Sequence, residues 1–264
     1  MKINTFVKPK NVQEAYDLLQ QNSKNQIIGG GCWLKNLPKE IETAIDLSFC
    51  ELGAITETEE WYEIGSTATL RDVEKVTSLV GFFDGILTRS IGEVMGVPFR
   101  NIATLGGTVA GKFGFSDILT ALLALDTEIH FWHRGSMSLD TYIKSKEHVA
   151  DILTGIRIKK SEGRGYYYTL KKTANDFPVV NCAITKSIEG YRISIGSRPG
   201  IATLAKDAMA YLNNVEVLDD AAINKAITLL VEEITFGTNP RGSKEYRREA
   251  IKGLIRRGLE EVNR

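Results

Sequence analysis

Hydrophobic and polar residues alternate with different periods along the chain, and these periods separate helices from strands. Apolar positions three and four apart follow Asn11, and Glu14 stands three residues after this candidate cap, which predicts a helix through about Leu19. Thr69, with Asp72 three residues later, predicts a second helix that ends near Val76. Further helices are expected at 85–90 and 117–125, and strands at 26–28, 43–47, 61–65, 128–133 and 151–158.

The polar, glycine-containing segment 159–165 is the best candidate for a domain boundary. Beyond it the pattern predicts strands at 166–171, 179–187 and 191–196, followed by helices at 204–212, 221–233 and 246–262. Strands grouped ahead of helices are typical of an α+β domain. The chain is therefore expected to be α+β, with a larger first domain and a smaller α+β C-terminal domain.

Composition narrows the possible partners. Lysine and arginine number 33 and aspartate and glutamate also number 33, so the sequence shows no bulk charge for nucleic acid or a membrane surface. Hydrophobic residues make up 43% of the chain, an ordinary share for a globular protein, and no window is apolar enough to span a membrane. The first ten residues lack the apolar core of a signal peptide, so a cytoplasmic location is expected.

The cysteines and histidines do not indicate a metal site. Cys32, Cys50 and Cys182 are widely spaced and odd in number, which argues against a disulfide framework and a metal centre. His130 and His133 lie in an aromatic run expected to be a strand, where a spacing of three puts the two rings on opposite faces.

Two glycine-rich stretches are the strongest chemical signals. The stretch from Arg100 to Asp117 holds four glycines, three hydroxyl side chains and one carboxylate, and an apolar run follows it. Earlier, Gly29, Gly30 and Gly31 follow the expected strand 26–28. Glycines let a backbone approach a ligand closely and point amides at phosphate oxygens, and an acidic residue after such a loop can hold a sugar hydroxyl. Together the stretches indicate a nucleotide cofactor.

Two common nucleotide motifs do not fit. The segment from Gly106 to Phe113 nearly matches the Walker A pattern, but Phe113 stands where a Mg²⁺-binding hydroxyl is needed. Neither glycine cluster has the spacing G-x-G-x-x-G of a Rossmann dinucleotide fold. An ATP-binding P-loop and a Rossmann domain are therefore disfavoured.

The motif Arg-Asn-x-Ala-Thr-x-Gly-Gly, followed by Ser116-Asp117 and a Leu/Ala-rich helix, resembles the FAD-binding subunit of the xanthine dehydrogenase family of molybdenum hydroxylases. The medium subunit of carbon monoxide dehydrogenases belongs to the same group. Further similar segments are 64–70, 175–180 and 241–247. The resemblance implies a two-part FAD-binding domain of the vanillyl-alcohol-oxidase-like (PCMH) type over 1–162, with subdomains of about 1–55 and 56–162, and a carbon monoxide dehydrogenase flavoprotein-type domain over 163–264.

The resemblance also implies which residues contact FAD. Two loops of that family grip the cofactor's diphosphate with backbone amides and hydroxyls, Asp117 matches an acidic residue on the adenosine side, and Lys171 matches a lysine near the flavin, although Lys172 is an equally good register. The full implied set is Ile28, Gly29, Gly30, Gly31, Cys32, Trp33, Leu34, Val94, Thr104, Gly106, Gly107, Thr108, Ser116, Asp117, Leu153 and Lys171.

Three departures from the family pattern are evident. Cys32-Trp33 replaces Thr-Asp, Thr108 replaces a common Asn, and Phe113-Gly114 replaces Ser-Pro. Backbone donors survive all three, so FAD binding is still expected, with a shifted flavin position or potential. Some flavin oxidases of the same broad fold attach FAD covalently through this loop, and Cys32 is the residue that could do so here.

The resemblance implies an oxidoreductase subunit that passes electrons from [2Fe–2S] clusters through FAD to an acceptor such as NAD. Its implied partners are an iron–sulfur subunit and a molybdopterin-binding subunit, and no side chain of this chain need act as a general acid or base. Two alternatives stay open. One is a self-sufficient flavin oxidase, which the short region after Gly165 disfavours; the other is a scaffold that has lost flavin, motivated by Cys32-Trp33.

Overall fold

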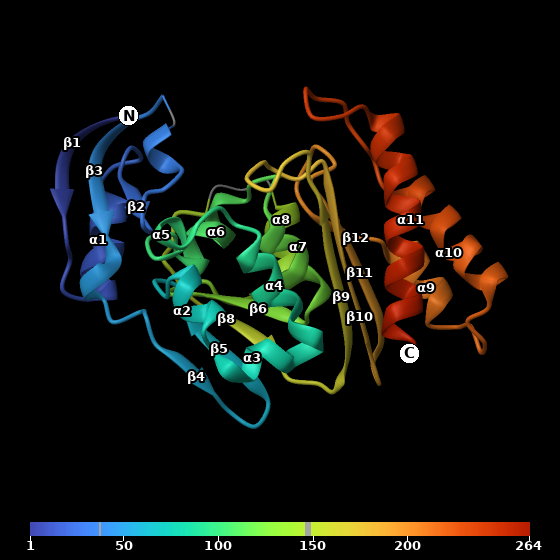
Figure 1. Cartoon of the computed structure of the whole chain (residues 1–264). Helices are drawn as coiled ribbons and strands as arrows, with labels where there is room; N and C mark the ends of the chain where they lie inside the picture. The colour runs from blue at the N-terminus through green and yellow to red at the C-terminus, as the bar shows by residue number, and fades with distance from the viewer. Residues whose placement is uncertain (37, 146–148) are drawn as a thin grey trace. The chain divides into compact units, whose positions relative to one another are not determined.

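A computed structural model describes residues 1–36, 38–145 and 149–264 (Figure 1). The chain forms two compact units, each built from separate stretches of sequence. The first unit comprises Met1–Val73, Gly96–Gly111 and Thr127–Lys160, and the second comprises Glu74–Met95, Lys112–Asp126 and Ser161–Arg264. The predicted α+β class is confirmed.

The first unit contains two sheets. A parallel sheet has the order β1-β3-β2, formed by β1 (Lys2–Val7), β3 (Glu40–Asp46) and β2 (Gln26–Ile28), and α1 (Val12–Gln21) packs on it through an apolar cluster. A second sheet has the order β4-β5-β8-β6-β7, formed by β4 (Ile55–Glu57), β5 (Trp61–Gly65), β8 (Leu153–Lys159), β6 (Thr127–Phe131) and β7 (Gly135–Ser138). Its helices are α2 (Leu70–Glu74), α5 (Val97–Arg100), α6 (Leu105–Gly111) and α8 (Leu139–Lys144), α2 ending at the first residue of the second unit.

The second unit is a four-stranded antiparallel sheet with helices on both faces. The sheet order is β12-β11-β10-β9, formed by β12 (Thr203–Leu204), β11 (Gly190–Gly196), β10 (Val180–Ser187) and β9 (Gly163–Leu170). One face carries α9 (Lys206–Leu212), α10 (Asp220–Glu233) and α11 (Lys244–Val262). On the other face lie α7 (Asp117–Ala124) and α4 (Ile86–Gly92), with α3 (Thr77–Gly81) before α4 (Figure 1).

Alternation along β10 explains the two faces of this sheet. Val180, Cys182 and Ile184 point into the apolar core shared with α9, α10 and α11. Asn181 and Thr185 point the other way and bond to α7, Asn181 through Thr120 Oγ1 at 2.9 Å and Thr185 through its own hydroxyl to the Ala124 carbonyl at 2.7 Å. Because side chains on a strand alternate, one strand serves an apolar core and a polar interface at once.

Local signals placed most predicted elements correctly. Asn11 caps α1 by accepting a hydrogen bond from the Glu14 amide at 2.9 Å, and the Thr69 hydroxyl accepts one from the Asp72 amide at 3.1 Å. Elements without such signals were missed, among them β1, the parallel partner of β3.

Several predicted boundaries differ from the structure, including the following three. The strand expected over 128–133 ends at Phe131, so His133 lies beyond it, and the Asp151 carboxylate accepts a hydrogen bond from its amide. The second predicted helix ends at Glu74 rather than Val76. The helix expected from 204 begins at Lys206, because Thr203 and Leu204 pair with β11 as β12.

Candidate functional site

The first glycine stretch forms a turn that only glycine fits. The chain leaves β2 at Ile28, and Gly30 and Gly31 take φ values of +68° and +67°, in the left-handed region that disfavours residues with a Cβ. A Cβ at Gly30 would also lie 2.0 Å from the Ile102 carbonyl oxygen. The amides of Gly30 and Gly31 donate no hydrogen bond to any of the residues that the structure describes, so this turn presents donors to a ligand.

The two glycine stretches, far apart in the sequence, lie against each other within the first unit. A Cβ on Gly29 would sit 2.7 Å from Thr104 Oγ1, and a Cβ on Gly107 would sit 3.0 Å from the Gly29 carbonyl oxygen. Real side chains do not fit at such distances, so both positions depend on glycine. The result is a close approach of two backbones, with the Thr104 hydroxyl lying beside both glycines.

The second stretch is fixed by its own hydrogen bonds. The Gly106 amide donates to the Ser66 carbonyl at 2.9 Å, and the Gly107 amide donates to Thr104 Oγ1 at 3.0 Å. The Thr108 amide and hydroxyl both donate to the Thr104 carbonyl at 3.0 Å. These three amides therefore serve the fold, whereas the Gly30 and Gly31 amides of the first loop donate to none of the described residues.

The remaining first-loop residues continue into a short 3-10 turn at Leu34–Asn36. Cys32 is half-buried, and burial raises the pKa of its thiol above the ordinary value. A raised thiol pKa keeps Cys32 protonated at neutral pH, which disfavours nucleophilic attachment of a cofactor. Trp33 is also half-buried, and Leu153 is buried at the start of β8.

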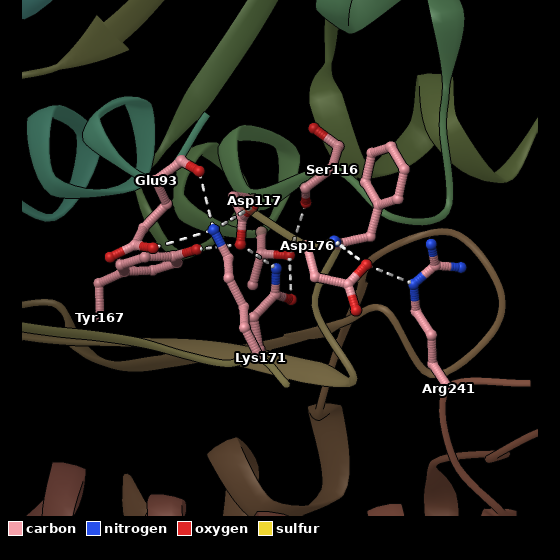
Figure 2. Close-up of polar contacts among 10 residues, drawn as sticks. Glu93, Ser116, Asp117, Tyr167, Lys171, Asp176 and Arg241 are labelled. Carbon is pink, nitrogen blue, oxygen red and sulfur yellow. Dashed lines mark hydrogen bonds and ion pairs between the residues drawn. The ribbon is translucent and has the colours of Figure 1, made fainter. Parts of the chain in front are cut away.

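Asp117, labelled in Figure 2, begins α7 in the second unit. Its side chain is deeply buried. Ser116 caps the helix by accepting a hydrogen bond from the Leu119 amide at 3.1 Å. Asp117 Oδ1 accepts hydrogen bonds from Tyr167 Oη at 2.5 Å and Asn181 Nδ2 at 2.9 Å. Burial raises the pKa of Asp117, while these two hydrogen bonds and the positive charge of Lys171 act to lower it.

Lys171 faces this carboxylate and Lys172 does not. Lys171 Nζ lies 4.0 Å from Asp117 Oδ2, donates to the Glu93 carbonyl at 2.8 Å, and lies 2.9 Å from the Glu93 carboxylate (Figure 2). Lys172 is exposed, and its Nζ lies 3.5 Å from the Pro240 carbonyl. Of the two possible registers, the structure therefore places Lys171 beside Asp117. Val94, next to Glu93, is half-buried.

Three further motifs meet near Asp117 in the second unit. Phe113 stacks on Phe115, whose ring lies 4.5 Å from that of Phe177. Arg241 lies over Phe177 at 4.9 Å and pairs with Asp176 at 3.1 Å (Figure 2). The aromatic contacts thus tie the segment before Ser116, where the family pattern has Ser-Pro, to the loop that follows β9.

The predicted residues thus fall into two groups. The first unit holds Ile28, Gly29, Gly30, Gly31, Cys32, Trp33, Leu34, Thr104, Gly106, Gly107, Thr108 and Leu153; the second holds Val94, Ser116, Asp117 and Lys171. The sequence motifs did not identify Tyr167, Asn181 or Glu93 as residues of the site. Tyr167 stands in a run of three tyrosines, and nothing in that run distinguishes the one that faces α7.

Comparison with known families agrees with this geometry. The profile described as "FAD binding domain in molybdopterin dehydrogenase" matches residues 1–159, more than half of the chain. The chain belongs to this family. The profile described as "CO dehydrogenase flavoprotein C-terminal domain" matches residues 165–262 of the same flavoprotein. The resemblance inferred from the motifs and the assignment of FAD as cofactor are both confirmed.

Two curated relatives of the flavoprotein are medium chains or subunits of oxidoreductases. It is 24% identical to the glyceraldehyde dehydrogenase medium chain of Sulfolobus acidocaldarius, over 98% of each chain. It is 23% identical to the nicotine 6-hydroxylase medium subunit of Paenarthrobacter nicotinovorans, over 97% of this chain and 96% of the relative.

Solved structures share the fold of the flavoprotein. A chain of carbon monoxide dehydrogenase from Hydrogenophaga pseudoflava superposes with a TM-score of 0.89 at 20% identity, covering 99% of this chain and 97% of that one. A chain of quinoline 2-oxidoreductase from Pseudomonas putida 86 gives 0.87 at 19% identity, covering 100% and 98%. Among the described residues, no helix has the length and apolar character needed to cross a membrane.

The residues present fit the FAD that the family implies. The left-handed turn at Gly30 and Gly31 offers amides to phosphate oxygens, and Gly29 and Gly107 hold the two loops close together where a Cβ would meet Thr104 Oγ1. The segments 28–34 and 104–108 contain no carboxylate that would repel a diphosphate. This agreement concerns the first unit alone.

Proposed function

We propose that this flavoprotein is the electron-transfer subunit of a molybdenum hydroxylase complex. In this proposal it receives electrons from an iron–sulfur subunit, which in turn takes them from a molybdopterin-binding subunit that oxidises the substrate. Bound FAD supplies the redox chemistry, because a flavin can exchange single electrons and also pass on a hydride equivalent. NAD is the proposed acceptor, and a cytoplasmic location stays a prediction.

The protein's own residues bind and orient the cofactor. We propose that the Gly30 and Gly31 amides donate to the diphosphate, while Gly29 and Gly107 let it lie close against the backbone. In the second unit, Asp117 accepts a hydrogen bond from the adenosine part, and Lys171, whose Nζ lies 4.0 Å from Asp117 Oδ2, supplies positive charge at the same part of the cofactor rather than at the flavin. The observation that carries the proposal is the mutual close approach of Gly29 and Gly107.

The direct test is the flavin content of the purified full-length chain. We expect a flavin absorption spectrum, or stoichiometric recovery of one when the cofactor-free chain is titrated with FAD. Absence of flavin binding in both experiments would overturn the proposal. Acid precipitation distinguishes the mode of attachment, because non-covalent FAD stays in the supernatant.

The electron-transfer role needs a second test. Co-purification from the source cells should recover an iron–sulfur protein and a molybdopterin protein with this chain. Steady oxidation of an organic substrate by the isolated chain would instead favour a self-sufficient flavin oxidase.

A further inference from the structure

The carboxylate of Asp117 is oriented by residues that lie outside the matched FAD-binding segment. Its Oδ1 atom accepts hydrogen bonds from Tyr167 on β9 and Asn181 on β10. The Asn181 amide is itself oriented, because Thr120 Oγ1 lies 2.9 Å from Asn181 Oδ1, which directs Nδ2 toward Asp117. Tyr167, Asn181 and Thr120 are all buried, so none of them can exchange these bonds for water.

This arrangement leaves one oxygen for a ligand. Oδ1 already accepts two hydrogen bonds, while Oδ2 faces Lys171 Nζ at 4.0 Å, a distance too long for a hydrogen bond. Lys171 is held in turn by the carbonyl and carboxylate of Glu93. The Thr169 hydroxyl also acts on this carboxylate and helps to lower the pKa of Asp117. A carboxylate can accept about four hydrogen bonds, so Asp117 keeps capacity for a ligand beside these groups. The bonds to Oδ1 fix the direction in which Oδ2 points.

We propose that Tyr167 and Asn181 are positioning residues for FAD, which hold the Asp117 carboxylate so that Oδ2 accepts a hydrogen bond from the adenosine part of the cofactor. The inference rests on the proposed function, in which Asp117 is an FAD ligand. It assigns a role in FAD affinity to the segment 165–262, to which the FAD-binding profile does not extend.

The pH dependence of FAD affinity distinguishes positioning from simple structural support. The titratable groups that face Asp117 are Tyr167 and Lys171, and Glu93 faces it across Lys171. The hydrogen bond from Tyr167 lowers the pKa of Asp117 against the effect of burial. Removing that hydroxyl therefore raises the pKa of Asp117 further. The proposed hydrogen bond from FAD needs the ionised form of Asp117. As the pH falls, that bond is then lost at a higher pH than in the wild-type chain.

The experiment measures the Kd for FAD of the cofactor-free full-length chain by flavin fluorescence, as a function of pH. Tyr167→Phe should raise Kd at neutral pH by about 3- to 10-fold, and the acid-side loss of affinity should begin at a higher pH. Tyr191→Phe is the matched control. Tyr191 lies in the same sheet and donates its hydroxyl to Asn263 Oδ1 at 2.7 Å, away from Asp117. Its Kd and pH profile should equal those of the wild type.

A substitution of Asp117 itself distinguishes failure of the proposed FAD site from failure of the positioning role of Tyr167 and Asn181. Asp117→Asn should weaken FAD binding and abolish the acid-side dependence that belongs to Asp117, leaving only the titration of adenine. If Asp117→Asn leaves Kd unchanged, Asp117 is not a ligand and the proposed site fails. If Asp117→Asn weakens binding while Tyr167→Phe changes neither Kd nor the pH profile, only the positioning inference is overturned.

Thr120→Val covers the case in which Tyr167→Phe does not fold. It removes the bond that orients the Asn181 amide without touching Asp117. A smaller rise in Kd in the same direction supports the inference, and an unchanged Kd in a folded Thr120→Val chain contradicts it.

Discussion

The two candidate regions for FAD are built in opposite ways. In the first unit the site is made mainly of backbone, since Gly29 and Gly107 lie so close to each other and to the Thr104 hydroxyl that a Cβ on either would be crowded. In the second unit the site is made of side chains, where Tyr167, Asn181 and Lys171 surround one carboxylate. The first region depends on the absence of side chains at its glycines. The second depends on hydrogen bonds and charge between polar side chains around Asp117.

This difference predicts different responses to mutation. A site made of backbone tolerates substitution of neighbouring side chains, but it does not tolerate replacement of its glycines by residues with a Cβ. A side-chain network tolerates small volume changes but no loss of a donor or acceptor, because a buried polar atom without a partner costs about 1–3 kcal/mol. The following changes test the contrast, beginning with the largest expected effect.

Replacement of Arg247 should have the largest effect on the second unit. Arg247 is fully buried, and its guanidinium donates to the carbonyls of Val179 at 2.6 Å, Gly237 at 2.6 Å and Gly242 at 2.5 Å, and to Asn239 Oδ1 at 2.6 Å. Arg247→Met removes all four hydrogen bonds and leaves the Val179 and Gly237 carbonyls without this donor, which should destabilise the chain by about 3–5 kcal/mol. Thermal unfolding measures the loss.

Arg248→Met is the control, because Arg248 is the next residue on α11 and is exposed. It should change stability by less than about 0.5 kcal/mol. Similar losses in the two variants would show that the hydrogen bonds of Arg247 contribute little.

Gly30→Ala should have the largest effect on the first unit. The left-handed conformation costs a residue with a Cβ about 1–2 kcal/mol, and the clash with the Ile102 carbonyl at 2.0 Å adds to it. We expect the variant to be purified without flavin. Absorbance at the flavin band, relative to protein absorbance, measures occupancy.

Gly253→Ala is the control for Gly30→Ala, because it replaces a glycine at a position that has room for a Cβ. Gly253 lies inside α11, and a Cβ at this position would meet no atom of the described residues within 4 Å. Alanine should therefore stabilise the helix by about 1 kcal/mol and leave flavin content unchanged. Full flavin occupancy in Gly30→Ala would show that the turn is not a cofactor contact.

Asp117→Ala should weaken FAD binding by about 1.5–3 kcal/mol, the value of one hydrogen bond to a charged group. It should also lower stability, because Tyr167 and Asn181 lose their common acceptor. FAD titration and thermal unfolding separate the two effects. An Asp117→Ala chain that unfolds earlier yet binds FAD with the wild-type Kd would identify Asp117 as a purely structural residue.

The contrast between the regions also explains which features of the site could be predicted from the sequence. Glycine runs at 29–31 and 106–107 are visible in the sequence because the absence of side chains is itself the signal. The caps at Asn11 and Thr69 are equally local, and both helices were found. The motif order from Ile28 to Asp117 was enough to identify the family and FAD.

The partners of Asp117 were not visible in the same way. Tyr167 and Asn181 reach it because β9 and β10 pair in a particular register, with Asn181 opposite Thr169, and that pairing spans many residues of sequence. A tyrosine and an asparagine on separate strands carry no local mark of a shared acceptor. The engagement of the Gly106 and Gly107 amides within the fold also depends on contacts, with Ser66 and Thr104, that only the folded chain supplies.

The smallest expected effect is on the pH dependence of stability in the cofactor-free chain. Burial raises the folded-state pKa of Asp117 above its value in the unfolded chain, which is about 3.9. Between these two pKa values the folded state binds more protons than the unfolded state, so the free energy of unfolding falls as pH rises. Asp117→Asn lacks this group and should lack this part of the dependence.

The difference in unfolding free energy between the wild-type and Asp117→Asn chains should therefore shift against the wild type as pH rises from about 4. Chemical denaturation at a series of pH values measures it, and subtraction of the two curves removes the contribution of the other carboxylates. A difference that shifts in favour of the wild type would mean that Tyr167, Asn181 and Lys171 stabilise the carboxylate by more than its burial costs. The second region would then hold Asp117 as an ionised acceptor, already arranged for a hydrogen-bond donor on the adenosine part of the cofactor.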